Sequence, residues 1–474
     1  MARTQVQAIV LAAGRSSRFK SDTSKLLFTL CGQEMIIYPL KTLQELAIPV
    51  TLVVGYKKDH IKRLIEHHSF DSVSYVEQPH QLGTGDAVAS TANLWYAEHV
   101  LVMNGDMPLI QPDLIQELIQ LHVNKDAAMS FVIAHNSDPI SSAGYGRIVT
   151  RDQTMAIIEA RDFKGDPTAD CFINAGIYVF KREFIKKYIN TLRTHENSQE
   201  LYLTDLVDIA SRQKLPIATV NAPFDTVRGV NTLKELWIAE QIKRAEIIEH
   251  WMSQGVRFTC AQSTHIDINV SIGAGTCIDT GAQILSATRI GKHSYIMPFS
   301  YIKNSVLGEQ VTVYSHSVIT DTTISDRVNV GPFAHIHNNN NIGAGSTIGN
   351  FVEISRTAIA HDTKIKHHSY IGNAHIGARV NIGAGTIICN YNGVNKNTTV
   401  IEEDAFIGSN NSLIAPVTIA HHAMTAAGSV ITEDVPPHAL AIARAKQINK
   451  ADYASKLRRS VNIDAAIKIN ETME

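Results

Sequence analysis

Aliphatic residues recur at every sixth position along the second half of the chain. This ladder begins with Ile266, Ile272, Ile278, Ile284, Ile290, Ile296 and Ile302, and after a few shorter steps it reaches Ile419. A period of six fits neither a helix nor an alternating strand. It is typical of a parallel β-helix, in which each short strand places one aliphatic side chain in a continuous inner stack. The pattern therefore predicts a β-helix over about residues 260–435, ended by Pro436 and Pro437.

The first half of the chain alternates apolar runs of strand length with stretches of helical spacing. The predicted strands are Ala8–Leu11, Val50–Val54, Val100–Met103, Met129–Ile133 and Ile173–Phe180. The predicted helices are Ile36–Leu46, Lys58–His67, Asp86–Tyr96 and Pro112–Val123. Several of the strands lack polar alternation, as is typical of a mostly parallel sheet that is covered on both faces. The alternation predicts an α/β domain.

A stretch of good helix formers without Gly or Pro separates these two halves. It covers residues 232–253 and ends just before Gly255, which predicts a linking helix. The alternative is that it forms the last helix of the first domain. We therefore expect a first domain over residues 1–231, a linker over 232–253, a β-helix domain over 254–445 and a charged tail over 446–474.

Composition restricts the class of partner. The net charge of −2 offers no electrostatic basis for binding nucleic acid or a membrane surface. No apolar run reaches the length that spans a membrane. The five cysteines are scattered and form neither a disulfide framework nor a zinc pattern; they are Cys31, Cys171, Cys260, Cys277 and Cys389. These features predict a reduced, cytoplasmic protein.

Candidate phosphate chemistry follows the first predicted strand. Leu11, Ala12, Ala13 and Gly14 lead into Arg15 and Arg18, and Lys25 comes shortly after. Small residues let backbone N–H groups approach phosphate oxygens, while the cations add charge. Asp106 follows the predicted strand Val100–Met103, and a carboxylate together with phosphates is a common way to hold Mg²⁺. An ordinary strand-to-helix turn explains the first loop equally well when it is taken alone.

Further motifs follow in a fixed order. They are Gln81–Asp86, Gly144–Arg147, Glu159, Asn174–Gly176, Tyr202–Asp205 and Gly229–Asn231. Joined to a hexapeptide β-helix, they resemble the bacterial family of bifunctional N-acetylglucosamine-1-phosphate uridylyltransferase/glucosamine-1-phosphate acetyltransferases. The resemblance extends to about Arg444. It implies an α/β nucleotidyltransferase domain with a Rossmann-like mixed sheet, joined by a long helix to a left-handed parallel β-helix.

The resemblance also implies a function and roles for residues of the first half. The family makes UDP-N-acetylglucosamine, a precursor of bacterial wall polymers, from UTP and N-acetylglucosamine-1-phosphate with release of pyrophosphate. Arg18 and Lys25 would act on the phosphates, and Asp106 with Asn231 would hold Mg²⁺. The nucleotide would contact Leu11, Ala12, Ala13, Gly14, Gln78, Gly83 and Thr84. The sugar would contact Gly146, Glu159 and Asn174.

For the second half, the resemblance implies acetyl transfer from acetyl-CoA to glucosamine-1-phosphate. His367 would be the base, since imidazole suits proton transfer near neutral pH, and Glu353 would orient it. The acceptor would contact Tyr370, Asn381, Asn390, Tyr391 and Lys396, of which the last three belong to a loop that interrupts the ladder. Asn390 and Tyr391, together with Ser409, Ala427 and Arg444, would border acetyl-CoA. Such β-helices assemble as homotrimers.

Several positions depart from the family pattern. Ser16 and Ser17 stand where the family has Gly and Thr, which bears on nucleotide preference. His337 and Ser355 stand where the family carries Arg and Lys at the acceptor phosphate. Because charge-assisted bonds contribute on the order of 1.5–3 kcal/mol each, we expect weakened acetylation or a different acceptor.

Other interpretations of the chain stay open at this point. One is a nucleotidyltransferase whose β-helix only trimerises or acylates another amine, and a second is a sugar-nucleotide sensor without turnover. A zinc site among the ladder histidines is a weaker hypothesis, because no pair has both the spacing and the Cys or carboxylate support of a zinc site.

Overall fold

The computed structural model describes residues 6–15, 17–68, 70, 73–135, 142–151, 154–166, 172–459 and 461. The chain divides into two compact units, residues 1–289 and 290–474. Within the described residues, no helix combines the length and the apolar character that crossing a bilayer requires.

A mixed sheet forms the centre of the first unit, in the order β11-β7-β10-β6-β1-β4-β5. Its strands are β1 Val6–Ala12, β4 Val50–Val54, β5 Val73–Glu77, β6 His99–Asn104, β7 Met129–His135, β10 Phe172–Lys181 and β11 Ile217–Pro223. The pair β8 Arg147–Arg151 and β9 Thr154–Ile158 is attached through β10. β1 runs parallel to β4 and β6, whereas β10 is antiparallel to β6 and β7. The predicted α/β sheet domain is confirmed, with its antiparallel member in the middle.

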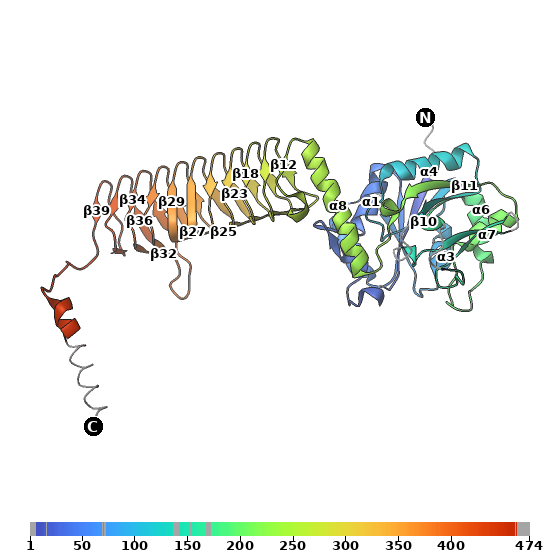
Figure 1. Cartoon of the computed structure of the whole chain (residues 1–474), viewed down its shortest axis with the longest axis horizontal. Coiled ribbons are helices and arrows are strands. Elements are labelled where there is room, and N and C mark those ends of the chain that lie inside the picture. The colour runs from blue at the N-terminus through green and yellow to red at the C-terminus, as the bar shows by residue number, and fades with distance from the viewer. Residues whose placement is uncertain are drawn as a thin grey trace, which may run out of the picture. The chain divides into compact units, whose positions relative to one another are not determined.

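Helices cover both faces of this sheet (Figure 1). They are α1 Ile37–Glu45, α2 Lys58–His67, α3 Thr84–Ala89, α4 Pro112–Asn124, α6 Arg182–Tyr188 and α7 Asp205–Arg212, whereas α8 Leu233–Ser253 contributes to neither core. Successive residues of β1 alternate between two cores. Val10 packs in one with α1, α2 and α4, while Ile9 packs in the other with α3, α6 and α7. Burial on both faces explains why the strands read as continuous apolar runs.

The first turns of the solenoid also belong to the first unit. They comprise β12 Arg257–Phe258, β13 His265–Ile266, β14 Ser271–Ile272, β15 Cys277–Ile278 and β16 Gln283–Leu285. α8 begins with Thr232 as its N-cap: the Thr232 hydroxyl accepts from the Glu235 N–H at 3.1 Å, and the Glu235 carboxylate accepts from the N–H of the preceding Asn231 at 2.8 Å. The predicted helix 232–253 is therefore present from residue 233.

Parallel strands repeat along the second unit as a β-helix (Figure 1). One sheet contains β18 Tyr295–Ile296, β19 Tyr301–Lys303, β21 Thr312–Val313, β22 Val318–Thr320, β24 Asn329–Val330, β25 His335–His337, β27 Thr347–Ser355, β29 Lys364–Gly372, β31 Asn381–Ile382, β32 Ile387–Cys389, β34 Phe406–Ile407, β35 Ser412–Ile414, β37 Met424–Thr425, β38 Val430–Ile431 and β39 Leu440–Ala441. The other contains β20 Val306–Leu307, β23 Thr322–Ile324, β26 Asn340–Ile342, β28 Ala358–Ile359, β30 Ala374–Ile376, β33 Thr399–Ile401 and β36 Val417–Ile419.

The aliphatic ladder forms the inner stack of this solenoid. Its members are buried, as Ile296, Ile336 and Ile407 illustrate with no exposed surface. The prediction that Pro436 and Pro437 end the ladder was wrong by one strand, because β39 follows them and pairs with β37. Proline is tolerated there because it lies between strands and removes no ladder hydrogen bond.

Candidate active sites

The glycine-containing loop and the Asp106 carboxylate lie at one edge of the first sheet. β1 and β6 are parallel neighbours in a register that places Leu11 beside Asn104. The Gly105 N–H donates to the Leu11 carbonyl at 2.9 Å. A Cβ on Gly105 would lie 2.6 Å from the terminal methyl carbon of Ile36 and 3.1 Å from the Leu11 carbonyl oxygen, so a larger residue here would have to displace the Ile36 side chain. Since carboxyl ends of parallel strands meet at this edge, it is the expected place for a ligand.

A cavity of about 420 Å³ opens beside the first loop, and we call it the nucleotide cavity. Its walls include the predicted nucleotide contacts Leu11, Ala12, Ala13, Gly14, Lys25, Gln78, Gly83 and Thr84. Gln78 is held by a bond from its amide to the Asp86 carboxylate at 2.7 Å. Gly83 has a φ of +104°, and a Cβ there would lie 2.5 Å from the Leu201 carbonyl oxygen. Glycine is therefore required where the loop enters α3.

A second cavity of about 270 Å³ lies next to it, and we call it the sugar cavity. The predicted residues Arg18, Asp106, Gly146, Glu159, Asn174 and Asn231 line it. The Thr204 hydroxyl donates to Glu159 at 2.9 Å, and the Asn174 amide donates to the Tyr178 hydroxyl at 2.6 Å. Leu11, Thr84, Asn104 and Asp106 border both cavities. The boundary between the cavities thus coincides with the Asp106 carboxylate.

Two cations converge on one amide oxygen at that boundary. Lys25 Nζ donates to Asn231 Oδ1 at 2.7 Å, and the Arg18 guanidinium donates to the same oxygen at 2.9 Å. Lys25 also forms an ion pair with Asp106. Its ammonium therefore lies where the Asp106 and Asn231 oxygens meet. Two hard oxygen ligands that face one cation fit a bound Mg²⁺ ion, provided that Lys25 turns away.

Residues that the sequence did not single out complete the sugar cavity. The Tyr145 hydroxyl accepts from the Gly229 N–H at 2.8 Å, and burial raises the pKa of this phenol. Burial also raises the pKa of Glu159, because a carboxylate is poorly solvated there, although the Thr204 hydroxyl opposes the shift. Tyr145 belongs to the motif that contains Gly146, so its position was the available signal.

On the β-helix, Asn350 is the partner of the predicted base. β27 and β29 pair in a register that sets Asn350 beside His367, and Asn350 Oδ1 lies 3.0 Å from His367 Nδ1. Glu353 was expected to orient His367, which is wrong. The Glu353 carboxylate lies 3.1 Å from Nε2 of His337. In the strand register, Glu353 lies beside Tyr370 rather than His367. The residue on β27 that contacts the His367 ring is therefore Asn350, three positions before Glu353.

Tyr370 and Asn390 converge over Gly372. A Cβ on Gly372 would lie 2.5 Å from the Tyr370 hydroxyl and 2.8 Å from the Asn390 amide nitrogen. That amide donates to Asn373 Oδ1 at 2.7 Å, and Arg356 donates to the same oxygen at 3.3 Å. Arg356 follows Ser355 directly, and a one-residue shift along a continuing strand would point its side chain to the other face. It instead has φ +50° at a corner, after β27 has ended at Ser355, and reaches this group.

The loop that interrupts the ladder leaves the solenoid after β32 (Figure 1). The backbone of Tyr391 bridges to Lys396, and the Tyr391 hydroxyl donates to the Gly393 carbonyl at 2.6 Å. Tyr391 is exposed, whereas Asn390 at the base of the loop is buried. Asn381 lies in register with Lys364, three positions from His367 along the coil. The predicted acceptor residues therefore surround one stretch of the β-helix surface.

One corner of the solenoid changes from large to small residues beside His367. Phe299, His316, Phe333 and Phe351 stack there, with ring centroids 5.0–5.5 Å apart. Beyond His368 the corner continues with Gly385, whose N–H donates to the His368 carbonyl at 2.9 Å. The Asn410 N–H donates to the Ala384 carbonyl, and the Gly428 N–H donates to the Ser409 carbonyl.

The predicted cofactor residues follow this small-residue part of the corner. Ser409 and Ala427 directly precede Asn410 and Gly428, just as His367 precedes His368. Arg444 Cδ lies 3.9 Å from the position a Cβ would take on Gly428. His367, Ser409, Ala427 and Arg444 therefore follow one edge of the β-helix, with Ala384 on the coil between His367 and Ser409.

The positions that depart from the family pattern make contacts of their own. His337 and Ser355 are neighbours in register on β25 and β27. The Asn338 amide nitrogen lies 2.7 Å from His337 Nδ1 and donates to the Ser355 hydroxyl at 3.2 Å. Ser16 and Cys171 lie outside the described residues, as does the side chain of Ser17.

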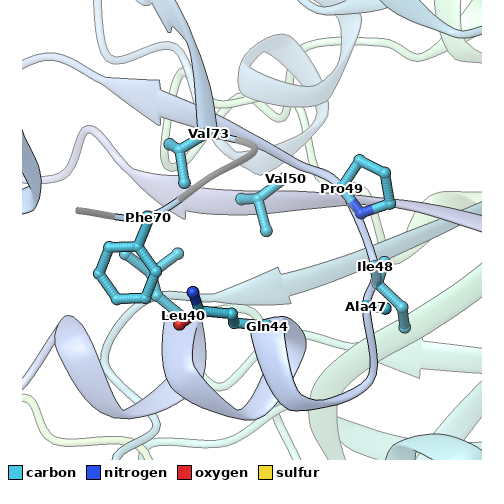
Figure 2. A pocket seen from close by; sticks show the side chains of 8 residues that line it. All are labelled: Leu40, Gln44, Ala47, Ile48, Pro49, Val50, Phe70 and Val73. Carbon is cyan, nitrogen blue, oxygen red and sulfur yellow. The ribbon is translucent and has the colours of Figure 1, made fainter. Parts of the chain in front are cut away.

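A further hollow of about 200 Å³ lies away from these groups (Figure 2). Leu40 and Gln44 of α1 face Val50, Phe70 and Val73 across it. Apart from Gln44 its walls are apolar, so it offers no set of groups for phosphate or acyl chemistry.

Comparison with known proteins follows the same division of the chain. The MobA-like NTP transferase domain family matches residues 8–168, and the GMPPB C-terminal domain family matches residues 318–426. A solved structure of CMP:2-keto-3-deoxy-manno-octonic acid synthetase with CTP covers 51% of this chain and 99% of its own, at 16% identity and a TM-score of 0.41. The fold and the first family match define an NTP transferase domain joined to a hexapeptide-repeat β-helix.

Relatives that match almost the whole chain make this class specific. The bifunctional protein GlmU of Exiguobacterium sibiricum is 39% identical over 94% of this chain and 99% of its own length. The bifunctional protein GlmU of Thermotoga petrophila is 37% identical over 96% of this chain and 100% of its own length. The chain belongs to the GlmU family of bifunctional proteins, and the resemblance drawn from its motifs is confirmed.

Proposed function

We propose that the nucleotide cavity binds UTP and that the sugar cavity binds N-acetylglucosamine-1-phosphate, with their phosphates meeting at Asp106. The protein is a bifunctional enzyme that makes UDP-N-acetylglucosamine. It first acetylates glucosamine-1-phosphate and then transfers a uridylyl group from UTP to the product. The observation that carries the assignment is the convergence of Lys25 and Arg18 on Asn231, at the boundary of the two cavities.

Uridylyl transfer needs positioning and positive charge rather than a protein nucleophile. A phosphate oxygen of the sugar phosphate attacks the α-phosphorus of UTP, the bond to the β-phosphate oxygen breaks, and pyrophosphate leaves. Negative charge develops on the oxygens around phosphorus, and Lys25 and Arg18 would lie against it. When bound, Mg²⁺ would be held by Asp106 and Asn231 and would neutralise phosphate charge. Lys25, released from Asp106, would then turn to the phosphates.

Acetyl transfer requires removal of a proton from the acceptor amine. The amine nitrogen attacks the thioester carbonyl, a C–N bond forms, the C–S bond breaks, and CoA leaves as the thiolate. His367 would take the amine proton at Nε2, since its Nδ1 faces Asn350. Tyr370, Asn381, Asn390 and Tyr391 would contact the amino sugar phosphate.

The run of small residues along the corner supports a place for acetyl-CoA. The aromatic stack ends at Phe351, one coil before His368, and Gly385, Asn410 and Gly428 follow at the same corner. Small side chains leave room along the edge beside Ser409 and Ala427, and Arg444 would face the negative charge of the cofactor. We propose that the thioester reaches His367 from this edge.

Assembly and organisation complete the proposal. The family resemblance supports a homotrimer with acetyl-transfer sites between subunits. Free thiols at Cys31, Cys260, Cys277 and Cys389 among the described residues support a cytoplasmic location. We assign uridylyl transfer to residues 1–231, the linker to 232–253, acetyl transfer to 254–445 and the tail to 446–474.

Paired substitutions test the assignment of the two cavities. Glu159→Gln and Asn174→Ala should raise the KM for N-acetylglucosamine-1-phosphate by about tenfold and leave the KM for UTP within about twofold. Gln78→Ala should raise the KM for UTP and leave the KM for N-acetylglucosamine-1-phosphate nearly unchanged. A rise in the KM for UTP in the Glu159 or Asn174 variants, with the sugar KM unchanged, would overturn the assignment.

A further inference from the structure

Three potential metal ligands converge on the β-helix surface away from the predicted Mg²⁺ site. His335 and His337 lie on β25, and Glu353 lies on β27, in register with His335. Their ligand atoms all lie within 4.8 Å of one another. The two imidazole rings stack with centroids 4.2 Å apart and planes 17° apart, and the Glu353 carboxylate lies 3.1 Å from His337 Nε2. Potential ligand atoms from two successive coils therefore lie close enough together to bind one metal ion.

The chemistry of this set fits a zinc-class ion rather than Mg²⁺. Two imidazoles and one carboxylate are typical ligands of Zn²⁺, at about 2.0–2.2 Å from the metal. Tetrahedral geometry at those bond lengths puts ligand atoms roughly 3.4 Å apart, so small side-chain rotations would close the set.

A polar side chain contacts the ring nitrogen of His337 that faces away from Glu353. The Asn338 side-chain amide lies 2.7 Å from His337 Nδ1. The oxygen and nitrogen of such an amide exchange places by a simple flip. With the oxygen toward Nδ1, Asn338 accepts the Nδ1 proton and directs Nε2 to the metal, as outer ligands of zinc histidines commonly do.

We propose that His335, His337 and Glu353 bind one zinc-class divalent cation per chain. Three protein ligands leave a fourth position for water or an anionic oxygen, as in open zinc sites. Glu353 pairs in register with Tyr370, so the proposed site lies next to the surface assigned to the acceptor. The site depends on none of the roles assigned to the nucleotide cavity or to His367.

Titration with Co²⁺ tests the site in the full-length protein. Chelator-treated protein in excess Mg²⁺, which saturates the Asp106 site, should bind one equivalent of Co²⁺ with a visible absorption band, and Zn²⁺ should displace it. Glu353→Gln and His337→Asn should each weaken binding at least about tenfold, and Asn338→Ala by about 10–100-fold. Zn²⁺ should raise the unfolding midpoint of the unsubstituted protein but not that of the Glu353 variant.

Another histidine group provides the matched control. His421, His422 and His438 also lie in ring contact, with Glu402 3.3 Å from His421. Their donors do not converge with a carboxylate as those of the proposed site do, so His421→Gln should leave the Co²⁺ titration unchanged. Absence of the stoichiometric band, or a band that persists in Glu353→Gln and His337→Asn, would overturn the proposal. Loss of the band in His421→Gln alone would do the same.

Discussion

Asn350 Oδ1 lies 3.0 Å from Nδ1 of His367, across two adjacent coils of the β-helix. An amide oxygen in this position accepts the Nδ1 proton and leaves the lone pair of the ring on Nε2, the atom that would accept a proton from an amine. Close approach of the two strands supports the contact. A Cβ on Gly349 would lie 1.8 Å from the Lys366 carbonyl oxygen, so only glycine fits beside Asn350.

Asn350→Ala should lower kcat for acetyl transfer more than it changes either KM, because the imidazole loses its orientation but substrate contacts remain. Replacing His367 itself should lower kcat for acetyl transfer by about 10²–10⁴-fold, and the decrease in the Asn350 variant should be smaller. CoA release with glucosamine-1-phosphate measures both. Asn350→Asp keeps an acceptor and should restore most of the rate. An Asn350→Ala enzyme with unchanged kcat would contradict the positioning role.

Asp106→Asn should abolish most uridylyl transfer by removing the charged ligand assigned to Mg²⁺. Losses of about 10²–10³-fold are usual when one group that stabilises transition-state charge is removed. Pyrophosphate release at increasing Mg²⁺ measures the effect, and the half-saturating concentration should rise. Acetyl transfer by the same variant provides the control and should be unchanged. A normal Mg²⁺ dependence would count against the assignment.

Arg356→Gln should raise the KM for glucosamine-1-phosphate by roughly tenfold or more, since a charge-assisted bond to phosphate contributes about 1.5–3 kcal/mol. Arg356 shares the Asn373 oxygen with Asn390 and so reaches the surface assigned to the acceptor. It would provide a cation that neutral Ser355 does not.

Arg379 offers the matched control for Arg356. It lies on the same β-helix but pairs with Asp404 and Glu403 on the exposed surface. Arg379→Gln should leave the KM for glucosamine-1-phosphate unchanged. Equal effects of the two substitutions would show that Arg356 has no special relation to the acceptor.

His122 should make the first unit sensitive to mild acid. Burial, reinforced by the neighbouring His99, lowers the pKa of His122 to about 4, and its Nδ1 lies 2.9 Å from the Ser130 hydroxyl. A depressed pKa contributes stability that is present above the ordinary value of 6.5 and is lost as pH falls toward 4. Thermal unfolding across this window should show a falling midpoint.

His122→Asn keeps a polar partner for Ser130 but does not titrate, so its unfolding midpoint should fall less over the same window. The variant will start from a lower midpoint because a ring is removed from the core. Parallel pH profiles for the two proteins would contradict this account.

The sequence predicted the architecture because two regular patterns dominate it. The aliphatic side chain at every sixth position enters the β-helix core, and apolar runs without polar alternation, such as Val50–Val54, form the sheet. The loop at Gly14 and the carboxylate at Asp106 were also predictable, since both follow strands whose carboxyl ends share an edge. The end of the ladder was less predictable. Pro436 and Pro437 lack a backbone N–H, but they lie between strands, so β39 can still follow them and pair with β37.

The contacts between coils could not be predicted without the register. Asn350 and His367 are 17 residues apart, while His335 and Glu353 are 18 apart, because coils differ by one residue where the ladder takes a short step. An assignment of each ladder residue to its coil would have placed Asn350 and Glu353 correctly. The course of Arg356 depends on a left-handed backbone at the corner, which no hydrophobic pattern reports.

Separate assays of the two reactions in single-site variants test the central claim most directly. Lys25→Ala should lose pyrophosphate release from UTP and N-acetylglucosamine-1-phosphate, yet keep CoA release from acetyl-CoA and glucosamine-1-phosphate. His367→Ala should show the opposite pattern, and the unsubstituted protein should catalyse both reactions. Pyrophosphate release without any CoA release by the unsubstituted protein would contradict the account of a bifunctional enzyme.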